Sequence, residues 1–569
     1  MKLVIAEKPN VAKSLAYVMG VKKKQDGYYE GEKYLVSWCL GHLIRMASPE
    51  GYNERYARWK IEDLPIFPDE FIYEVSPKTK KQFYVLKKLM ADKRVDSIIN
   101  ACDAGREGEL IFRLVYDKAK CRKKIERIWI SSMEDQAIRA GFQNLKDGKA
   151  FENLYDSALA RSMADWLVGM NLSRLYSCLY KQPYSVGRVQ TPTLNMITER
   201  DVAIENFVKE KYYTVEIGCE GLTLSSDRID DYSVAEQLRN LIDRKIRLSD
   251  VISKKKVIAP DKPYDLTTLQ REANKKYGYS AQKSLDLAQR LYEKKLITYP
   301  RTDSRYLTDD MKRSIKSLLE NLSPGFTVYE KSFGSIFNSS KVSDHYAIIP
   351  TLLQNKEPLE KLSSDEKKIY QLIKAKLLMA CAEPLVESMT KVIYHYDGFD
   401  FTAQAKRVID PGFTVFSIGE KEQKGKILPP LQAEDVLEVL DVLIKEKYTK
   451  PPSHFTEDTL LKAMEVAGND ALQKGVDVER KGLGTPATRA GIIENLIHKG
   501  FVERDKKNLL VTHKGINLVT IVENTFKSAK TTAEWEMKLS DIAKGKASKE
   551  AFLKEIKGEL KETIEKYKK

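Results

Sequence analysis

The sequence predicts a multidomain protein of mixed α/β and α+β class, and three observations support this prediction. The chain has 569 residues, enough for about three to five domains at roughly 150 residues each. Its first 150 residues alternate between short apolar strands and helical segments, as in a parallel sheet covered by helices. Later in the chain, two separated stretches show the alternation of β-strands, while the rest is mainly helical.

The N-terminal region places two strands directly ahead of polar turns. Leu3-Val4-Ile5 is apolar, and Pro9 stands where a helix would begin. A second strand, Ser97 to Cys102, leads through the acidic turn at 103–109 into an amphipathic helix. Strand, turn and helix in this order form the βα unit of a parallel sheet, whose ligands gather at the carboxyl ends of the strands.

The middle of the chain alternates between helical and β patterns. Residues 151–180 form one continuous helical pattern, and residues 263–384 are mainly helical as well. Residues 212–222 and 389–409 alternate and are rich in β-branched and aromatic side chains, as strands prefer. We expect these two stretches to be halves of one β domain that the chain enters and leaves twice.

From about residue 455 the chain is helical apart from one hairpin. Residues 487–498 predict a helix that Gly500 ends, and strands are predicted at 501–504 and 509–512. A helix followed by a hairpin is a winged-helix-like unit, which suits DNA binding but also occurs in structural roles. A final helix from Ser548 carries its apolar residues on one face, which predicts docking against the rest of the protein.

The charge balance points to a polyanionic partner. There are 96 Lys and Arg against 81 Asp and Glu, a formal net charge of +15. Such a surplus favours nucleic acid first and an anionic membrane surface second. No apolar run approaches the roughly 18 residues of a membrane span, and the N-terminus reaches Pro9 too soon for a signal peptide. We therefore expect neither secretion nor membrane insertion.

The sequence lacks the motifs of zinc sites and of ATP-binding loops. The six cysteines form no C-x-x-C pair and the six histidines no H-E-x-x-H motif, which argues against structural zinc and zinc hydrolases. Reduced thiols in a cytosolic protein are the simpler interpretation. Residues 278–284 come closest to a Walker A loop but lack the second glycine before the lysine, so ATP hydrolysis has no support.

Acidic residues stand at the ends of both predicted N-terminal strands. Glu7 and Lys8 follow the first strand, and Asp103, Glu107 and Glu109 follow the second. Carboxylates brought together in this way repel one another unless a hard cation lies among them, and oxygen ligands favour Mg²⁺. The alternative interpretation is that these acids stabilise helix N-termini through the macrodipole.

A second candidate group of residues surrounds Tyr299. A phenol is a poor nucleophile until its phenolate is stabilised. Arg301, two residues on, carries a guanidinium that suits a phosphate oxygen or the developing charge. Pro300 would fix the backbone between the two side chains. By itself, the segment could equally be a surface turn that carries a tyrosine.

Six motifs in a fixed order resemble those of the type IA DNA topoisomerases, most closely the topoisomerase III branch. The motifs are AEKP at 6–9, DAGREGE at 103–109, SVGRVQTPTL at 185–194, LITYPRTDSRYL at 296–307, KVSDHYAIIPT at 341–351 and GLGTPATRA at 482–490. The resemblance runs from Met1 to about Leu539, where TAEWEMKL is another string of the family.

The resemblance implies a toroid of a Toprim domain, helical winged-helix-like domains and a β arch. The expected divisions are a Toprim domain at 1–150, a DNA-binding helical domain at 151–210 and 455–569, a β arch at 211–262 and 385–454, and a catalytic-tyrosine domain at 263–384.

The resemblance also implies the roles of the reacting residues. Tyr299 would attack a single-stranded phosphodiester and keep the 5′ phosphate as a phosphotyrosine, with Arg301 holding the phosphate. Glu7 would act as general acid toward the leaving 3′ oxygen, and Lys8 would offset charge in the transition state. One ester replaces another, so resealing needs no ATP.

The remaining site residues follow from the same motifs. Glu7, Asp103 and Glu107 would hold Mg²⁺. His345 matches a histidine near the phosphate, although a buried structural histidine is the alternative. The expected DNA contacts are Trp59, Arg161, Ser185, Val186, Gly187, Arg188, Val189, Gln190, Thr485, Thr488 and Arg489.

Simpler interpretations exist for some of these DNA contacts. Arg161 could pair with Asp165 one turn along the same helix. Thr485 and Thr488 could cap a helix N-terminus, which is also where phosphate binds, so both interpretations can hold together.

The chain departs from the family pattern in two places. Many relatives have an Asp where this chain has Gly105, so one carboxylate of the metal site is missing. Many relatives also carry cysteine-rich zinc modules after the toroid, whereas the segment after Leu539 is basic and free of cysteine.

Taken together, we expect an ATP-independent, Mg²⁺-dependent enzyme that relaxes negative supercoils or decatenates DNA. It would act on single-stranded DNA and on supercoiled or catenated duplexes as a cytoplasmic, nucleoid-associated monomer, with a helicase as a candidate protein partner and no membrane. Two alternatives are another Toprim enzyme such as a primase, which leaves Tyr299 unexplained, and a non-catalytic architectural single-strand DNA-binding protein, which the charge alone would suit.

Overall fold

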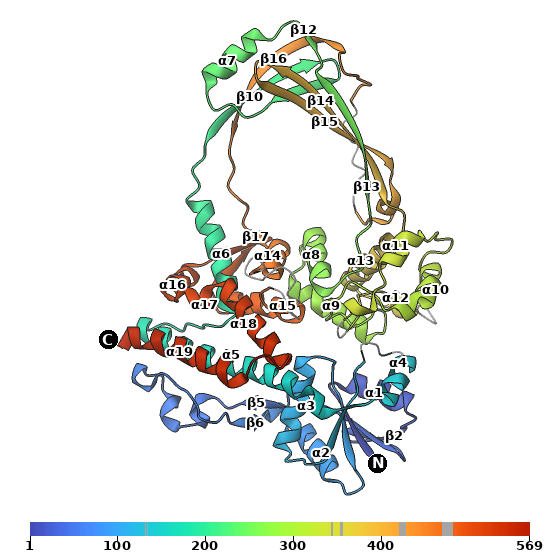
Figure 1. Cartoon of the computed structure of the whole chain (residues 1–569), viewed down its shortest axis with the longest axis vertical. Helices are drawn as coiled ribbons and strands as arrows, with labels where there is room; N and C mark the ends of the chain where they lie inside the picture. The colour runs from blue at the N-terminus through green and yellow to red at the C-terminus, as the bar shows by residue number, and fades with distance from the viewer. Residues whose placement is uncertain are drawn as a thin grey trace.

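The computed structural model describes residues 1–130, 133, 135–342, 345–352, 357–419, 428–468 and 482–568. Its elements form a ring, with a β arch at one end, a helical base across the middle and an α/β domain below the base (Figure 1). Ser343 and Asp344 of the KVSDHYAIIPT motif lie outside the described residues. No helix in the described ranges is both long and apolar enough to cross a membrane.

The N-terminal domain is built on a seven-stranded sheet of order β2-β3-β4-β1-β7-β8-β9. The neighbours β4, β1, β7 and β8 run parallel, as the strand–turn–helix pattern predicts. Leu3 and Ile5 of β1 face one core, and Val4 and Ala6 face the other, because side chains alternate along a strand. The strands are β1 (Lys2–Ala6), β2 (Lys23–Gln25), β3 (Tyr28–Glu30), β4 (Tyr34–Trp38), β7 (Ser97–Ala101), β8 (Lys124–Arg127) and β9 (Lys146–Asp147).

Helices cover this sheet, and the domain also contains a separate two-stranded sheet. Pro9 is the first residue of α1, where its fixed φ suits a helix start. The helices are α1 (Pro9–Val18), α2 (Lys80–Ala91), α3 (Arg106–Lys118) and α4 (Asp135–Gln143), and the two-stranded antiparallel sheet is β5 (Ile44–Met46) with β6 (Tyr73–Val75). The 3₁₀ turns of the chain are η1 (Pro49–Gly51), η2 (Glu54–Ala57), η3 (Ile61–Asp63), η4 (Pro77–Thr79), η5 (Gly148–Phe151), η6 (Asp309–Met311), η7 (Ser339–Lys341) and η8 (Gly412–Phe416).

The base joins two segments that lie far apart in the sequence. The 29-residue α5 (Glu152–Tyr180) packs against α18 and the C-terminal α19, whose Phe552, Ile556 and Leu560 are buried as their spacing predicts. Here α15 and the sheet β17-β19-β18 form the predicted helix–hairpin unit. The other elements are α6 (Gln190–Glu205), β17 (Phe455–Thr456), α14 (Glu457–Val466), α15 (Pro486–His498), β18 (Val502–Asp505), β19 (Asn508–Val511), α16 (His513–Ile521), α17 (Asn524–Lys527), α18 (Ala529–Ala543) and α19 (Lys549–Lys568).

The β arch is one sheet made by two visits of the chain. Its order is β12-β16-β10-β11-β15-β14-β13, so strands from before and after the tyrosine-bearing helices pair along it. Residue Lys211 pairs with Tyr448 at one foot, and Ile258 pairs with Leu385 at the other. The elements are β10 (Lys211–Cys219), β11 (Leu222–Ser226), α7 (Tyr232–Leu241), β12 (Lys245–Arg247), β13 (Asp250–Ile258), β14 (Leu385–Tyr396), β15 (Phe399–Asp410) and β16 (Val436–Tyr448).

The helical domain that carries Tyr299 closes the ring on the remaining side. Its loop 297–302 lies beside residues 345–350, and an isolated β-bridge joins Ile297 to Pro350. The helices are α8 (Leu266–Tyr277), α9 (Ala281–Glu293), α10 (Lys312–Leu322), α11 (Glu330–Ser335), α12 (Glu357–Glu360) and α13 (Ser364–Cys381).

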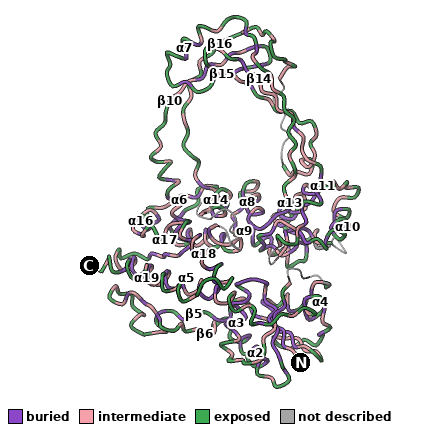
Figure 2. Tube along the Cα trace, in the orientation of Figure 1, coloured by how far each residue is buried: buried purple, intermediate pink, exposed green. Residues whose placement is uncertain are grey.

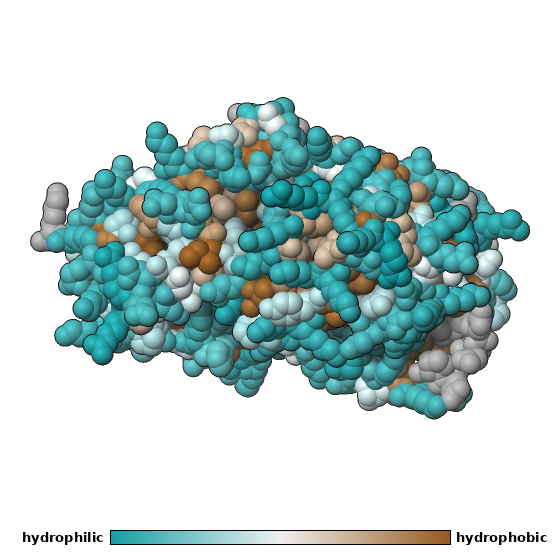
Figure 3. All heavy atoms as spheres, turned by 90° about the horizontal axis from the view of Figure 1, so that it is seen from below, coloured by the Kyte–Doolittle hydropathy of each residue, from teal (hydrophilic) through white to brown (hydrophobic). Residues whose placement is uncertain are grey.

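Burial is uneven around the ring. Buried residues gather in the N-terminal sheet and the helices of the base, whereas the arch is largely intermediate or exposed (Figure 2). Seen from below, the surface is mostly hydrophilic with small scattered apolar areas (Figure 3). The arch therefore depends on its strand pairing more than on a thick core.

We expect Glu366→Gln to destabilise the tyrosine domain by about 1–2 kcal/mol. Glu366 closes the capping box of α13 with Ser363, and it binds Lys294 at 2.7 Å. Burial alone would raise the pKa of this carboxyl, but Lys294 and Ser363 lower it to about 2 from an ordinary value of 4.5. The stabilisation is thus complete above about pH 4.5 and is lost as the pH falls toward 2.

Chemical denaturation of both proteins between pH 7 and pH 3 checks this expectation. The difference in unfolding free energy should shrink as the pH falls. The exposed Glu293, which accepts a hydrogen bond from Gln289 of its own helix, gives the control Glu293→Gln. A difference that stays constant over this range would contradict the assignment.

Candidate functional site

The candidate site lies where the carboxyl ends of β1 and β7 meet the loop of Tyr299. Ala6 and Ala101 are register partners on these parallel strands, so Glu7 and Asp103 emerge side by side. On the facing domain, the Thr298 hydroxyl donates to the Ala347 carbonyl at 2.9 Å. That bond helps hold the loop of Tyr299 beside the segment of His345.

Lys8 is the centre of the polar contacts in this site. Its ammonium donates to the Tyr299 hydroxyl at 2.9 Å, and it lies 3.0 Å from a Glu7 oxygen and 3.6 Å from an Asp103 oxygen. One cation therefore joins two carboxylates of the N-terminal domain to the phenol of another domain.

The pKa values of the two acids in the site shift in opposite directions. Burial raises the pKa of Glu7, Asp103 adds to this rise, and Lys8 opposes it. Burial would also raise the pKa of Asp103, but His345 and Lys8 outweigh burial and hold it below its ordinary value. For Lys8, burial opposes the charge, but Asp103, Glu7 and Tyr299 raise its pKa above the usual value. Glu7 is thus the acid better able to keep a proton.

Two rings enclose the phenol of Tyr299. Its ring centroid lies 5.2 Å from that of Tyr292 and 4.4 Å from that of His345. His345 Nε2 lies 3.7 Å from an Asp103 oxygen, which is too long for a hydrogen bond. Arg301 is exposed, and no hydrogen bond or ion pair of it occurs within the described part of the chain. The structure therefore gathers four of the five predicted catalytic residues and leaves the guanidinium of Arg301 in solvent.

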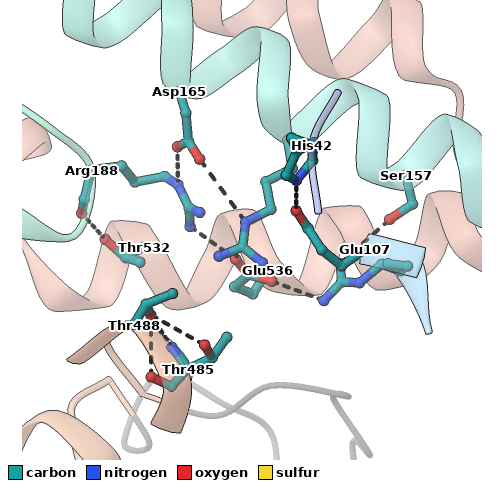
Figure 4. A network of polar contacts seen from close by, with 11 residues as sticks. His42, Glu107, Ser157, Asp165, Arg188, Thr485, Thr488, Thr532 and Glu536 are labelled. Atoms are coloured by element: carbon teal, nitrogen blue, oxygen red, sulfur yellow. Dashed lines mark hydrogen bonds and ion pairs between the residues drawn. The ribbon is translucent and has the colours of Figure 1, made fainter. Parts of the chain in front are cut away.

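The predicted metal ligands only partly come together. Glu7 and Asp103 share Lys8, while Glu107 lies 2.5 Å from His42 (Figure 4). Among the described residues, no group of three or more His, Cys, Asp or Glu forms a ready metal centre. The oxygen donors of Glu7 and Asp103 are nonetheless of the kind that Mg²⁺ prefers, and a protein can hold that ion with one or two carboxylates.

Glu109, which follows the same predicted strand as Asp103 and Glu107, forms buried ion pairs instead of joining the acidic group. It is 1% exposed and binds Arg113 at 2.9 Å and Arg127 at 3.2 Å. Its carboxylate also accepts from the Asn100 amide at 2.8 Å. Glu109 therefore fixes α3 to the sheet, and the expectation that it joins the acidic group is wrong because buried arginines hold it elsewhere.

His42 is a residue of the site that the sequence reasoning missed. It follows β4, whose carboxyl end lies at the same edge of the sheet as that of β1. Burial would lower the pKa of His42, but Glu107 outweighs it and Glu7 adds to the rise. The signal was the apolar run Tyr34–Trp38, a third strand that ends at this edge.

The predicted DNA-contact loop at 185–190 lies against α15. Gln190 accepts from Asn495 at 2.8 Å, and the Ser185 hydroxyl accepts from Lys499 at 2.7 Å. Val186 is buried, and Gly187 and Val189 lie in the same loop before α6. This places two motifs that are about 300 residues apart in the sequence side by side.

Arg188 does not present its guanidinium to solvent. It is 7% exposed and binds Asp165 at 2.8 Å and Glu536 at 2.9 Å. Arg161 lies 4.0 Å from Asp165, so the alternative i,i+4 pair is present at its outer limit, and it lies 3.8 Å from Glu536. Trp59 is half-exposed with the guanidinium of Arg174 5.1 Å from its ring centroid.

The segment before α15 has the geometry of a capped helix. The Thr485 amide donates to the Thr488 hydroxyl at 2.9 Å, and the two threonines form a capping box. Arg489 is buried, and it donates to the Thr267 hydroxyl at 3.0 Å. The capping interpretation is therefore correct for the threonines, while Arg489 joins the base to the tyrosine domain.

Comparisons with known proteins identify relatives over nearly the whole chain. A family model described as DNA topoisomerase matches residues 149–554, and a Toprim domain model matches residues 2–133. DNA topoisomerase 3 of Bacillus licheniformis is 43% identical over 99% of this chain and 81% of its own length. The enzymes of the same name from Bacillus subtilis and Staphylococcus epidermidis are 42% and 38% identical, over 82% and 83% of their lengths and 100% of this chain.

A solved structure agrees with these sequence relatives. Full-length topoisomerase I from Thermotoga maritima superimposes with a TM-score of 0.74 at 26% identity, covering 99% of this chain and 90% of the other. The expected fold class, with a Toprim domain in a larger ring, is confirmed. A primase or a purely architectural protein does not account for matches over both halves of the chain.

We expect Lys8→Met to lower the rate of DNA cleavage by about 100-fold or more, because the variant loses the only ammonium at the centre of the described site. Affinity for a single-stranded oligonucleotide should change little, since the binding loops are untouched. Quantifying covalent adducts over time and binding by anisotropy checks both points. Lys13→Met on the exposed face of α1 is the matched control, and a Lys8→Met enzyme that cleaves at the wild-type rate would refute the role.

Proposed function

The chain belongs to the type IA DNA topoisomerases, on the topoisomerase 3 branch, and from this premise we propose that Tyr299 is the residue that breaks and rejoins one DNA strand. The enzyme is ATP-independent and changes DNA topology. We assign it a single-stranded cleavage site, a 5′-phosphotyrosine intermediate and the passage of another strand through the ring.

The contact between Lys8 and Tyr299 carries this proposal. It is a 2.9 Å hydrogen bond between residues 291 positions apart, on two domains that face each other across the site. An ammonium that donates a hydrogen bond to a phenol lowers the free energy of the phenolate more than that of the phenol. A purely structural tyrosine would not need a hydrogen bond from a cation that itself lies beside two carboxylates.

The reaction balances without an energy source. The Tyr299 hydroxyl gives up its proton to water and its oxygen attacks the phosphorus, the bond from phosphorus to the 3′ oxygen breaks, and Glu7 gives a proton to that leaving oxygen. The raised pKa of Glu7 suits a general acid. Lys8 and Arg301 offset the negative charge on the phosphoryl group and the phenolate. Because one phosphodiester replaces another, the reverse attack by the 3′ hydroxyl reseals the strand.

Glu7, Asp103 and Glu107 are the residues that we propose to hold Mg²⁺. When bound, the ion would supply positive charge beside the 3′ hydroxyl and the phosphate and so favour resealing. Lys8 now binds two of these carboxylates. Glu7 and Asp103 would therefore be balanced by Lys8 in the free protein and by Mg²⁺ as well in the complex with DNA.

Strand passage requires the tyrosine domain to leave the Toprim domain. In the closed ring, the contacts across this face include the Lys8–Tyr299 hydrogen bond and the approach of His345 to Asp103. Once Tyr299 has cleaved the DNA, these side chains would contact the cleaved ends instead of one another. We further propose that the protein acts as a cytoplasmic, nucleoid-associated monomer, with a helicase as candidate partner, and that both relaxation and decatenation are within its reach.

We expect Tyr299→Phe to bind single-stranded DNA normally and to form no covalent adduct. The change removes the nucleophilic oxygen and keeps the ring packing against Tyr292 and His345. Denaturing gels of protein trapped on a labelled oligonucleotide measure the adduct. Tyr292→Phe, which alters the neighbouring phenol, should still form it. An adduct on Tyr299→Phe would show that the nucleophile lies elsewhere.

We expect a chelator to stop supercoil relaxation while leaving some cleavage of single strands. Gly105→Asp should then lower the Mg²⁺ concentration needed for half-maximal relaxation by about 3- to 10-fold, because it adds a carboxylate beside Asp103. Gly105 is extended at φ −163°, a conformation open to any residue. The backbone therefore does not demand glycine there.

Gly105→Asn is the control, since it adds the same bulk without charge. Magnesium titrations of relaxation by the three proteins decide the matter. Full relaxation in excess chelator, or an equal effect of Asp and Asn, would contradict the metal assignment.

A further inference from the structure

Lysines from several elements converge on the turn that joins α8 to α9, residues 277–280. Gly278 ends α8 in the left-handed region at φ 67°, and the ring centroids of Tyr277 and Tyr279 lie 5.4 Å apart. The turn begins the segment 278–284 that comes closest to a Walker A loop. Because that segment lacks the second glycine, its backbone cannot enclose the phosphates of a nucleotide. What this place binds therefore depends on the side chains around it.

Two lysines of the tyrosine domain hold their ammonium groups over these rings. Lys368 of α13 lies 5.5 Å from the ring centroid of Tyr277 and 5.8 Å from that of Tyr279. Lys283 of α9 lies 4.0 Å from the Tyr279 centroid. Both ammonium groups also approach Asp365, at 2.7 Å for Lys283 and 3.8 Å for Lys368. The rings and this carboxylate therefore position two cations at the same place.

The base adds two more lysines from the turn between β18 and β19. Lys507 donates to the carbonyl of Lys275 at 3.2 Å, and its side chain lies beside Gly278. Lys506 precedes it in the same exposed turn. The tip of the winged-helix-like unit thus contacts the tyrosine domain and brings its positive charge to the end of α8.

Most of these lysines have no acidic partner of their own. Asp365 pairs with Lys283 and Lys368. Glu503 and Asp505 on β18 precede the basic turn, but in the described ranges neither forms an ion pair with these lysines. Over the same ranges, four exposed lysines form no ion pair at all, namely Lys275, Lys367, Lys506 and Lys507. We call these four residues, with Lys283 and Lys368, the lysine surface.

A shallow hollow opens the lysine surface to a ligand. Tyr277 bounds it on one side, and α13 bounds it on the other with Ser364, Lys367, Lys368 and Gln371. Their spacing places these four residues of α13 on one face of the helix. The side chain of Lys368 is 45% exposed although it pairs with Asp365. Its charge is therefore still available to an anion in the hollow.

We propose that the lysine surface binds the phosphate backbone of duplex DNA beside the single-stranded cleavage site. Ammonium groups are compact point charges that suit phosphates spread along a strand and do not read bases. Duplex DNA carries about one negative charge per 1.7 Å of its axis, so an electrostatic surface favours it over a single strand. This inference rests on the proposed function, because it presupposes a DNA substrate with duplex next to the cleaved strand.

The two tyrosines argue against a single strand as the ligand of this surface. Proteins that bind single strands stack unpaired bases on open aromatic faces. Tyr279 is only 7% exposed, and lysine ammonium groups lie over both rings. The rings therefore orient cations and do not offer a platform for a base.

The test combines Lys275→Gln, Lys367→Gln and Lys507→Gln in the full chain. The probe is a blunt duplex of about 20 base pairs, which has no single strand to cleave, and anisotropy measures its affinity at several salt concentrations. Each lost phosphate contact should make the log–log salt slope shallower by about 0.9. We expect a change in slope of about 2 to 3 and an affinity weaker by about 10-fold or more at low salt.

The matched control combines Lys22→Gln, Lys24→Gln and Lys33→Gln. These exposed lysines lie at the β2 edge of the N-terminal sheet and form no ion pair within the described part of the chain. The control removes the same net charge from another place, so it should weaken duplex binding by less than about 2-fold. Both variants lose only exposed side chains, and both should keep the Tm of wild type.

Duplex affinity and salt slope equal to those of the control would refute the lysine surface. An equal loss of affinity for oligo-dT of the same length would show a single-strand site and refute the duplex assignment. Adduct formation on a single-stranded oligonucleotide should stay at the wild-type level in both variants. Normal adducts with unchanged duplex binding would overturn this inference alone, whereas a wild type that forms no adduct would overturn the proposed function.

Discussion

The site is held together by a single ammonium that three acidic groups share. Glu7 and Asp103 are brought side by side by parallel strands, where two negative charges would repel each other without a cation. Lys8 supplies that cation, and its ammonium also donates a hydrogen bond to the phenol of Tyr299. The same ammonium therefore lies beside both acids and joins two domains.

This arrangement follows from the way the chain is folded into a ring. The chain crosses the arch twice, so the tyrosine domain is attached by strands to a sheet far from the Toprim domain. Where the two domains meet, side-chain contacts rather than the backbone close the ring. Polar contacts of this kind can be exchanged for contacts with DNA, whereas a continuous hydrophobic core could not open without unfolding.

Much of this could be predicted from the sequence because its signals are local. The apolar strands before Glu7 and Asp103 specify a parallel sheet, and the spacing of apolar residues specifies α5 and α19. Six ordered motifs resemble one family and point to Tyr299. The partners of charged residues were not predictable, because they depend on distant segments. Glu536 lies 348 residues from Arg188, and Glu109 is held by Arg127 of β8 as well as by Arg113 one turn along its own helix. His42 was missed because its strand was not recognised as ending at the same edge of the sheet.

End-labelled oligonucleotides test whether Tyr299 captures the 5′ side of a broken single strand. One oligonucleotide carries its label at the 3′ end and a matched one carries it at the 5′ end, and each is trapped on the protein under denaturing conditions. We expect only the 3′-end label to stay on the protein and peptide mapping to place the adduct on Tyr299. Retention of the 5′-end label instead, or an adduct on another residue, would contradict it.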